Sequence, residues 1–304
     1  MRLRLGRPDI ATYRDRFDVP AAGAGLAVTF LGVSTLLIED GVSAIMTDGY
    51  FSRPSLARVG LRRIAPDPAR IDEALGRAGV ATLDAVIPVH THFDHALDSA
   101  VVAERTGAVL VGGGSATQVG RGHGLPADRL VAVTPGAPMR FGGFEVTLVE
   151  SHHCPPDRYP GTITAPVVPP VRASAFRCGE AWSTLVRHAG SGRSALVQGS
   201  AGFVPGALDG ASADVSYLGV GQLGIQPDDY IERYWHETVT TVGARRAVLV
   251  HWDDFFRPLT RPLRALPFAG DDLDRTMSVL VPLADRDGVA LSFPTVFARE
   301  NPWA

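Results

Sequence analysis

The 304-residue chain contains no lysine, so all 29 of its basic residues are arginines, a bias that we attribute to its source. It has two cysteines, Cys154 and Cys178, which are too few for a disulfide framework or a structural zinc knuckle. No apolar run approaches the roughly 18–20 residues of a membrane span. The charged start, MRLRLGRPDIATYRDRF, lacks the apolar segment of a secretory signal. These absences predict a cytoplasmic protein without a membrane span.

The charge balance is close to neutral, with 32 acidic and 29 basic residues. The chain also lacks a basic tract interleaved with aromatic residues, so we expect no nucleic-acid partner. A hydrophobic content of 45% argues against intrinsic disorder. We therefore predict one domain over residues 1–304, with residues 1–23 as an N-terminal extension. The expected partner is a small-molecule substrate, and a homo-oligomer remains open.

Short apolar runs separated by glycine and aspartate predict strands and helices in both halves of the chain. The predicted strands are 27–30, 34–39, 43–48, 84–89, 108–112, 144–150, 182–188, 194–199, 214–221 and 247–252. The predicted helices are 68–79, with Asp67 as N-cap and Gly79 as stop, 94–106, 228–242 and 271–283. Each half has strands first and then alternates strand and helix, which favours two stacked sheets with helices outside. Residues 112–115 read as a glycine turn, 121–123 as a surface loop, and 154–176 as a long proline-rich loop.

The densest cluster of metal-binding residue types is His90-Thr91-His92-Phe93-Asp94-His95, directly after the predicted strand 84–89. Residues i and i+2 that leave a strand point the same way, so His90 and His92 can hold one ion. Asp94 and His95 then turn back at the start of a helix and can reach a second ion. Such a cluster predicts a metal site.

This hexapeptide resembles the signature of the metallo-β-lactamase superfamily, whose members are mostly hydrolases. Residues 31–39, 46–49 and 249–252 are similar to motifs of its ascorbate-6-phosphate lactonase and N-acylphosphatidylethanolamine phospholipase D branch. The resemblance runs from about Ala24 to Phe255. It implies an α/β (α+β) fold of four layers, an αββα sandwich, and a metal-dependent hydrolase.

The resemblance also implies two metal sites, residue by residue. The implied ligands are His90, His92 and His153 for the first metal, and Asp94, His95 and His251 for the second. His152 competes with His153, which we favour because it falls in the family's column, and His152 then lines the pocket. Asp94 is the implied catalytic residue, orienting the nucleophile and accepting its proton. Asp48 is a candidate to accept the other N–H of a ligand histidine.

One position departs from the family pattern. The family's bridging aspartate is replaced by Ser200, in the turn 198–202. One subclass of true metallo-β-lactamases has serine there and holds its second zinc ion with Asp, His and His, the set found here. We therefore expect two sites, the second weaker. Cys154 is a soft-ligand alternative to the missing aspartate, although a buried structural thiol is the favoured interpretation.

Five imidazoles and one carboxylate favour zinc over magnesium or calcium, with manganese and iron as alternatives. The predicted reaction is hydrolysis of a small ester, lactone or phosphoester by a metal-activated water. Two other classes remain open. One is an iron-binding redox or dioxygenase-type member of the same superfamily, which would be coloured, and the other is a non-catalytic, metal-stabilised module.

Overall fold

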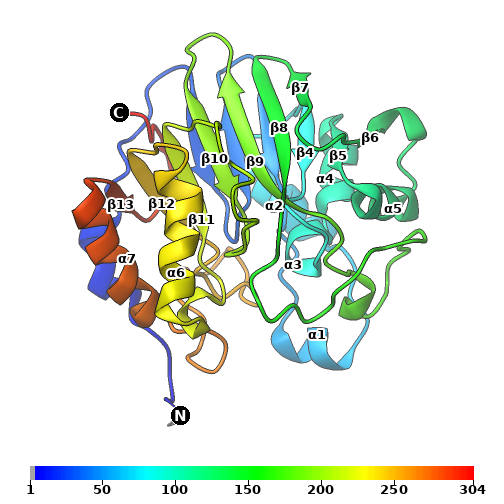
Figure 1. Cartoon of the computed structure of the whole chain (residues 1–304). Coiled ribbons are helices and arrows are strands. Elements are labelled where there is room, and N and C mark those ends of the chain that lie inside the picture. Colours follow the sequence, from blue (N-terminus) through cyan, green and yellow to red (C-terminus); the bar gives the residue numbers. More distant parts are fainter. Residues whose placement is uncertain (1–3) are drawn as a thin grey trace.

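The computed structural model describes residues 4–304, which form two seven-stranded sheets stacked face to face (Figure 1). The first sheet has the order β14-β1-β2-β3-β4-β5-β6 and the second β13-β12-β11-β10-β9-β8-β7. The first contains β1 (Ala27–Phe30), β2 (Leu36–Glu39), β3 (Ala44–Thr47), β4 (Ala85–Ile87), β5 (Val109–Gly112), β6 (Leu130–Ala132) and β14 (Arg299–Glu300). The second contains β7 (Pro138–Phe141), β8 (Phe144–Ser151), β9 (Ala181–His188), β10 (Ser194–Gln198), β11 (Val215–Gly219), β12 (Arg246–Val250) and β13 (Ala290–Ser292).

Helices cover the outer face of each sheet (Figure 1). They are α1 (Leu56–Leu61), α2 (Pro68–Arg77), α3 (Phe93–Ala96), α4 (Ser99–Thr106), α5 (Gly114–His123), α6 (Asp228–Trp235) and α7 (Leu273–Asp287). Helices α2, α4 and α5 pack on the first sheet, and α6 and α7 on the second. The predicted αββα sandwich is thus confirmed. Over residues 4–304, no helix is both long enough and apolar enough to span a membrane.

The core between the sheets comes from strands whose side chains alternate between two faces. In β8, Phe144, Val146 and Leu148 are buried, while Glu145 between them is exposed. A period of two residues is what a strand with one covered face requires. These side chains meet Val28 and other apolar residues of the first sheet. The strand predicted for 144–150 is confirmed.

The helix predicted over 94–106 is two helices, α3 and α4, because the chain bends at Asp98. The Asp98 carboxylate is fully buried and accepts hydrogen bonds from the backbone N–H groups of Phe51 and Ser52 at 2.8 and 2.6 Å. A long-range contact of this kind decides the break, and the local pattern does not contain it. By contrast, the predicted N-cap is confirmed, since Asp67 accepts from the N–H of Arg70.

Helix α5 was not predicted, because residues 112–115 and 121–123 read as a turn and a loop. Glycine is among the weakest helix formers, so local propensity points away from a helix here. Packing against β5 and β6 outweighs it. A side chain at Gly120 would place its Cβ 2.4 Å from Leu130 Cδ2, so the leucines of the sheet would have to move to admit it.

The N-terminal residues that the structure describes pack against the second half of the molecule. A 3-10 helix spans Ile10–Arg16. The ring of Phe17 stacks on Phe293, with centroids 5.3 Å apart. Residues 1–3, where the predicted extension begins, lie outside the described residues. The division into one domain and an extension stays a prediction.

Candidate metal centre

The predicted ligands lie where strands end, at one edge of the two sheets. In the second sheet β8 and β10 are both antiparallel to β9, so they run in the same direction, and β11 and β12 are parallel to β10. In the first sheet β3 and β4 are parallel. His90 follows β4, His153 follows β8, and His251 follows β12. Residues far apart in the sequence therefore meet at one edge, as is general for sites at the carboxyl ends of parallel strands.

The first group consists of His90, His92 and His153, whose ligand atoms lie within 4.8 Å of one another. His90 Nε2 and His92 Nδ1 are 3.1 Å apart. His153 Nδ1 donates to the carbonyl oxygen of Cys154 at 2.6 Å, which leaves its Nε2 for the group. The neighbouring His152 is exposed and outside the group.

The second group consists of Asp94, His95 and His251, also within 4.8 Å of one another. Asp94 Oδ2 lies 3.8 Å from His95 Nε2 and 3.5 Å from His251 Nε2. Asp94 and His95 belong to α3, a single turn that directs both side chains to the same place. The fold thus brings His251 next to the hexapeptide, although the two are far apart in the sequence.

Asp48 holds His95 in position. Its Oδ2 accepts hydrogen bonds from His95 Nδ1 at 2.9 Å and Ser34 Oγ at 2.6 Å, and its Oδ1 accepts from the N–H of Val89 at 2.9 Å. All these groups are buried. With Nδ1 of His95 bound to a carboxylate, its Nε2 is the ring nitrogen that faces Asp94.

Asp157 makes a matching contact with His92, and our sequence analysis did not single it out. Its Oδ1 lies 3.1 Å from His92 Nε2, on the side of the ring opposite His90. Asp157 lies in the proline-rich loop 154–176, where no local pattern marks it as the partner of a histidine. The buried Cys178 lies beside this pair, and the three form another compact group of metal-binding residue types.

Ser200 and Cys154 are the two residues considered in place of the missing aspartate, and a hydrogen bond joins the Ser200 side chain to the Cys154 backbone. Ser200 Oγ accepts from the backbone N–H of Cys154 at 2.9 Å. Burial raises the pKa of the Cys154 thiol, and Asp271 adds to the effect, so the thiolate that metals bind is disfavoured. Among residues 4–304, the Cys154 thiol belongs to none of the compact groups of His, Cys, Asp and Glu side chains.

The residues of both groups suit a divalent cation. His95 Nε2 is buried and has no hydrogen-bond partner within the described residues, which is unfavourable unless a ligand occupies the site. Burial lowers the pKa of His153 to about 4, and His92 adds to the effect. Burial, together with His95 and His92, also lowers the pKa of His90 well below its usual value. Both imidazoles are therefore neutral near pH 7, as metal binding requires.

Asp94 is ionised in this setting. Burial alone would raise its pKa, but His95 and His251 outweigh burial and hold the pKa of this carboxyl below its usual range. The two groups together thus offer five imidazoles and one carboxylate anion.

The backbone around His251 is held by a chain of buried contacts. The His251 N–H donates to the carbonyl oxygen of Val33 at 2.6 Å, and the Val33 N–H donates to Asp253 Oδ1 at 2.8 Å. Asp253 in turn pairs with the buried Arg53. Gly221 is required next to this turn, since a Cβ there would lie 2.8 Å from His251 Nδ1.

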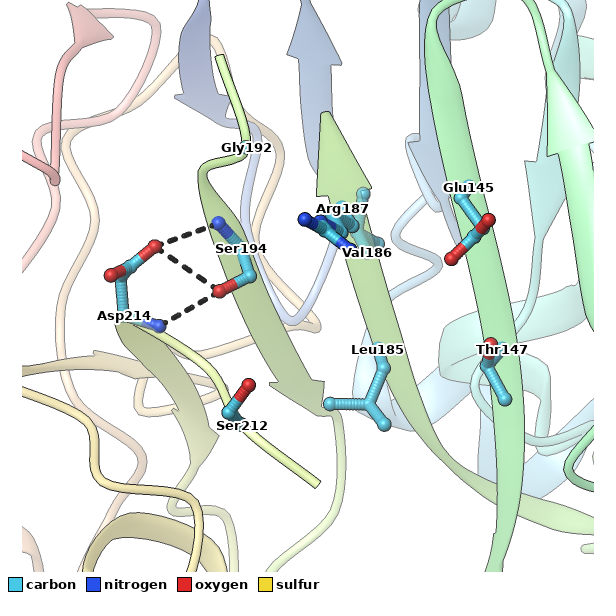
Figure 2. Close-up of a pocket in the computed structure, with 9 residues that line it drawn as sticks. All are labelled: Glu145, Thr147, Leu185, Val186, Arg187, Gly192, Ser194, Ser212 and Asp214. Carbon is cyan, nitrogen blue, oxygen red and sulfur yellow. Dashed lines mark hydrogen bonds between the residues drawn. The ribbon is translucent and has the colours of Figure 1, made fainter. Parts of the chain in front are cut away.

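Both groups open into a cavity of about 630 Å³, a usual size for a small-molecule site. His92, Asp94, His153, Ser200 and His251 contribute to its lining. Another cavity, of about 410 Å³, lies over β8, β9 and β10 (Figure 2). Its lining has no histidine or cysteine, and Asp214 there is already bonded to Ser194 (Figure 2). The first cavity is therefore the candidate site.

Comparison with known proteins gives relatives of modest similarity. No protein-family model matches the chain. An uncharacterised protein of Mycobacterium tuberculosis is 25% identical over 298 residues, covering 91% of this chain and 71% of that protein. A protein of Roseiflexus castenholzii named UPF0173 metal-dependent hydrolase is 32% identical over 132 residues, covering 43% of this chain and 49% of that protein.

Solved structures share the architecture over most of the chain. A possible metal-dependent hydrolase from Veillonella parvula has a TM-score of 0.58 at 15% identity, covering 91% of this chain and 99% of that chain. The chain shares this fold, the αββα sandwich that the resemblance to the metallo-β-lactamase superfamily implied. CmlA, a diiron β-hydroxylase from Streptomyces venezuelae, has a TM-score of 0.53 at 12% identity, covering 92% of this chain and 54% of that chain. The fold alone therefore does not decide the reaction, and the lactonase and phospholipase D branch stays a prediction.

The neighbouring residues His152 and His153 allow a matched test of the first group. We expect His153→Ala to weaken binding of one zinc ion by about 100-fold or more, because a direct ligand is lost. His152→Ala should leave both affinities unchanged, because that side chain is exposed. Competition with a chromophoric chelator measures both. A loss on His152→Ala with none on His153→Ala would reverse the assignment.

Proposed function

We propose that the chain is a hydrolase with two divalent cations, zinc in the first instance, that cleaves a small ester, lactone or phosphoester. The observation that carries the proposal is the meeting of two three-residue ligand groups at one cavity. The names of the Roseiflexus and Veillonella relatives support the general class, metal-dependent hydrolase.

In this proposal, His90, His92 and His153 hold one cation, and Asp94, His95 and His251 hold the other. The bound cations supply Lewis acidity and make a water molecule acidic near neutral pH. Asp94 holds the attacking water through its carboxylate and accepts the proton. Asp48 keeps His95 in the tautomer that the site needs, and Asp157 places a negative charge beside Nε2 of His92.

The charge count supports an electrophilic site. The six proposed ligands carry one negative charge, from Asp94, because Ser200 replaces a second carboxylate. Two divalent cations would therefore leave a net positive charge at the cavity floor, which favours attack on a carbonyl or phosphoryl group and stabilises the oxyanion that forms. The same lack of a shared anion weakens the second site.

Metal content and hydrolysis, measured on the same purified protein, test the proposal. We expect about two equivalents of a colourless metal and hydrolysis of a lactone or phosphodiester from a small panel. Chelation should abolish activity and zinc should restore it. One equivalent with full activity would contradict the two-metal version.

The competing classes give different results in the same experiment. Bound iron with a visible spectrum, and no hydrolysis, would replace the proposal by a redox function. A protein that hydrolyses nothing and unfolds on chelation would be a metal-stabilised module.

A further inference from the structure

Three arginines contribute to the lining of the same cavity, and the proposed reaction uses none of them. They are Arg7, Arg158 and Arg264. Apart from Asp94, Asp254 is the acidic residue of that lining. Guanidinium groups therefore outnumber free carboxylates on the wall.

Asp254 arranges two of these arginines side by side. Its Oδ2 accepts hydrogen bonds from Arg264 Nε and Nη2 at 3.0 and 2.8 Å, and from Arg7 Nη1 at 3.3 Å. Arg7 Nη1 also donates to the carbonyl oxygen of Ala265 at 2.6 Å. Within the described residues, Arg7 Nη2 and Arg264 Nη1 have no such partner, so they remain available to a ligand. Two guanidiniums beside one carboxylate keep a net positive charge.

Arg7 reaches the cavity because the N-terminal segment is tied to the loop that forms this wall. The N–H of Phe268 donates to the carbonyl oxygen of Gly6 at 3.1 Å. The guanidinium of Arg4 lies 3.8 Å from the centroid of the Phe268 ring. The predicted N-terminal extension thus contributes a side chain to the site.

Much of the remaining wall is apolar. Its apolar side chains include Leu56, Val59, Phe93, Phe255, Phe256 and Leu266. The rings of Phe255 and Phe256 are 4.4 Å apart and form a continuous surface. Leu56, which is 63% exposed, stands at the cavity with no apolar cover of its own. A ligand that fills this space would bury these side chains.

We propose that the cavity binds an organic anion with an apolar body, whose phosphate or carboxylate group is held by Arg7 and Arg264. A planar guanidinium binds such groups through paired, charge-assisted hydrogen bonds. The apolar body packs on the phenylalanines and Leu56. The proposal names the substrate class of the proposed hydrolase and rests on it for the reaction, while the binding itself is measurable without turnover.

The test uses calorimetric titration of the full, metal-loaded chain with octyl phosphate, octanoate, octanol and inorganic phosphate. We expect one of the two amphipathic anions to bind at least about tenfold more tightly than octanol or inorganic phosphate. Arg7→Gln and Arg264→Gln should each weaken that binding by about tenfold or more. Arg105→Gln is the matched control and should leave it unchanged, because Arg105 pairs with Asp72 at the surface and does not line the cavity.

Unchanged affinity in both Arg7→Gln and Arg264→Gln would overturn the proposal, because the anion would then be held by the metal centre alone. Equal affinity for inorganic phosphate and octyl phosphate would overturn the proposal that the ligand has an apolar body bound by the phenylalanines and Leu56. If Arg7→Gln does not fold, Arg264→Gln still decides, since its side chain is 42% exposed. If binding depends on the arginines but the chain hydrolyses no substrate, the proposed hydrolase function is wrong and the proposed anion site stands.

Discussion

Asp94→Asn is expected to lower kcat/KM by about 10³-fold or more. Asp94 is the one anion among the six proposed ligands, and its carboxylate lies within 3.8 Å of His95 and 3.5 Å of His251. An amide of the same size is a weaker metal ligand and cannot accept a proton. Loss of a general base alone lowers rates by about 10²–10⁴-fold, and the weakened second cation adds to this.

The measurement is kcat/KM on the best substrate of the panel, together with metal equivalents per chain. We expect the first group to keep its cation in the variant, because His90, His92 and His153 are untouched. Asp228→Asn is the control, since Asp228 is exposed, pairs with Arg275 and does not line the cavity. An Asp94→Asn enzyme within tenfold of the parent would rule Asp94 out as the catalytic residue.

Asp253→Ala is expected to lower the free energy of unfolding by about 3–5 kcal/mol, the usual effect of removing one partner of a buried ion pair. The side chains of Arg53 and Asp253 are fully buried. Without Asp253, the Arg53 guanidinium keeps its charge in the interior, and Nε and Nη1 already have no hydrogen-bond partner within the described residues. The N–H of Val33 also loses its acceptor, and Val33 holds the backbone of His251.

Urea unfolding measures this effect, with Asp72→Ala as the control. Asp72 pairs with Arg105 at the surface, and exposed pairs contribute about 0–1 kcal/mol. The double variant Arg53→Met, Asp253→Leu should recover much of the loss, because it removes both charges. Equal losses in Asp253→Ala and Asp72→Ala would show that the buried pair does not stabilise the fold.

The spacing of residues in the hexapeptide 90–95 was enough to predict four of the six proposed ligands. His90, His92, Asp94 and His95 lie together because a strand end and a single helical turn dictate where their side chains point, and both are local in sequence. The strands were predictable for the same reason, since the alternation in β8 is readable from consecutive residues. Helix α5 was not predictable from the sequence. Its stability comes from packing on β5 and β6, whereas its glycines locally disfavour a helix.

The family resemblance favoured His153 over its neighbour His152, and the tertiary structure gives the physical reason. His152 and His153 are adjacent, and only the path of the chain after β8 turns one toward His90 and the other to solvent. Asp157 and Arg7 carry no local signal, because each acts through a partner distant in sequence, His92 and Asp254 respectively.

The sequence by itself thus predicted the layered fold and the metal-binding residues of the hexapeptide, since both depend on spacing over a few residues, while His153 and His251 came from the family resemblance. The tertiary structure decided which carboxylates orient the histidines and which arginines stand at the cavity. Those contacts join side chains brought together only when the two sheets stack and the N-terminal segment closes against them.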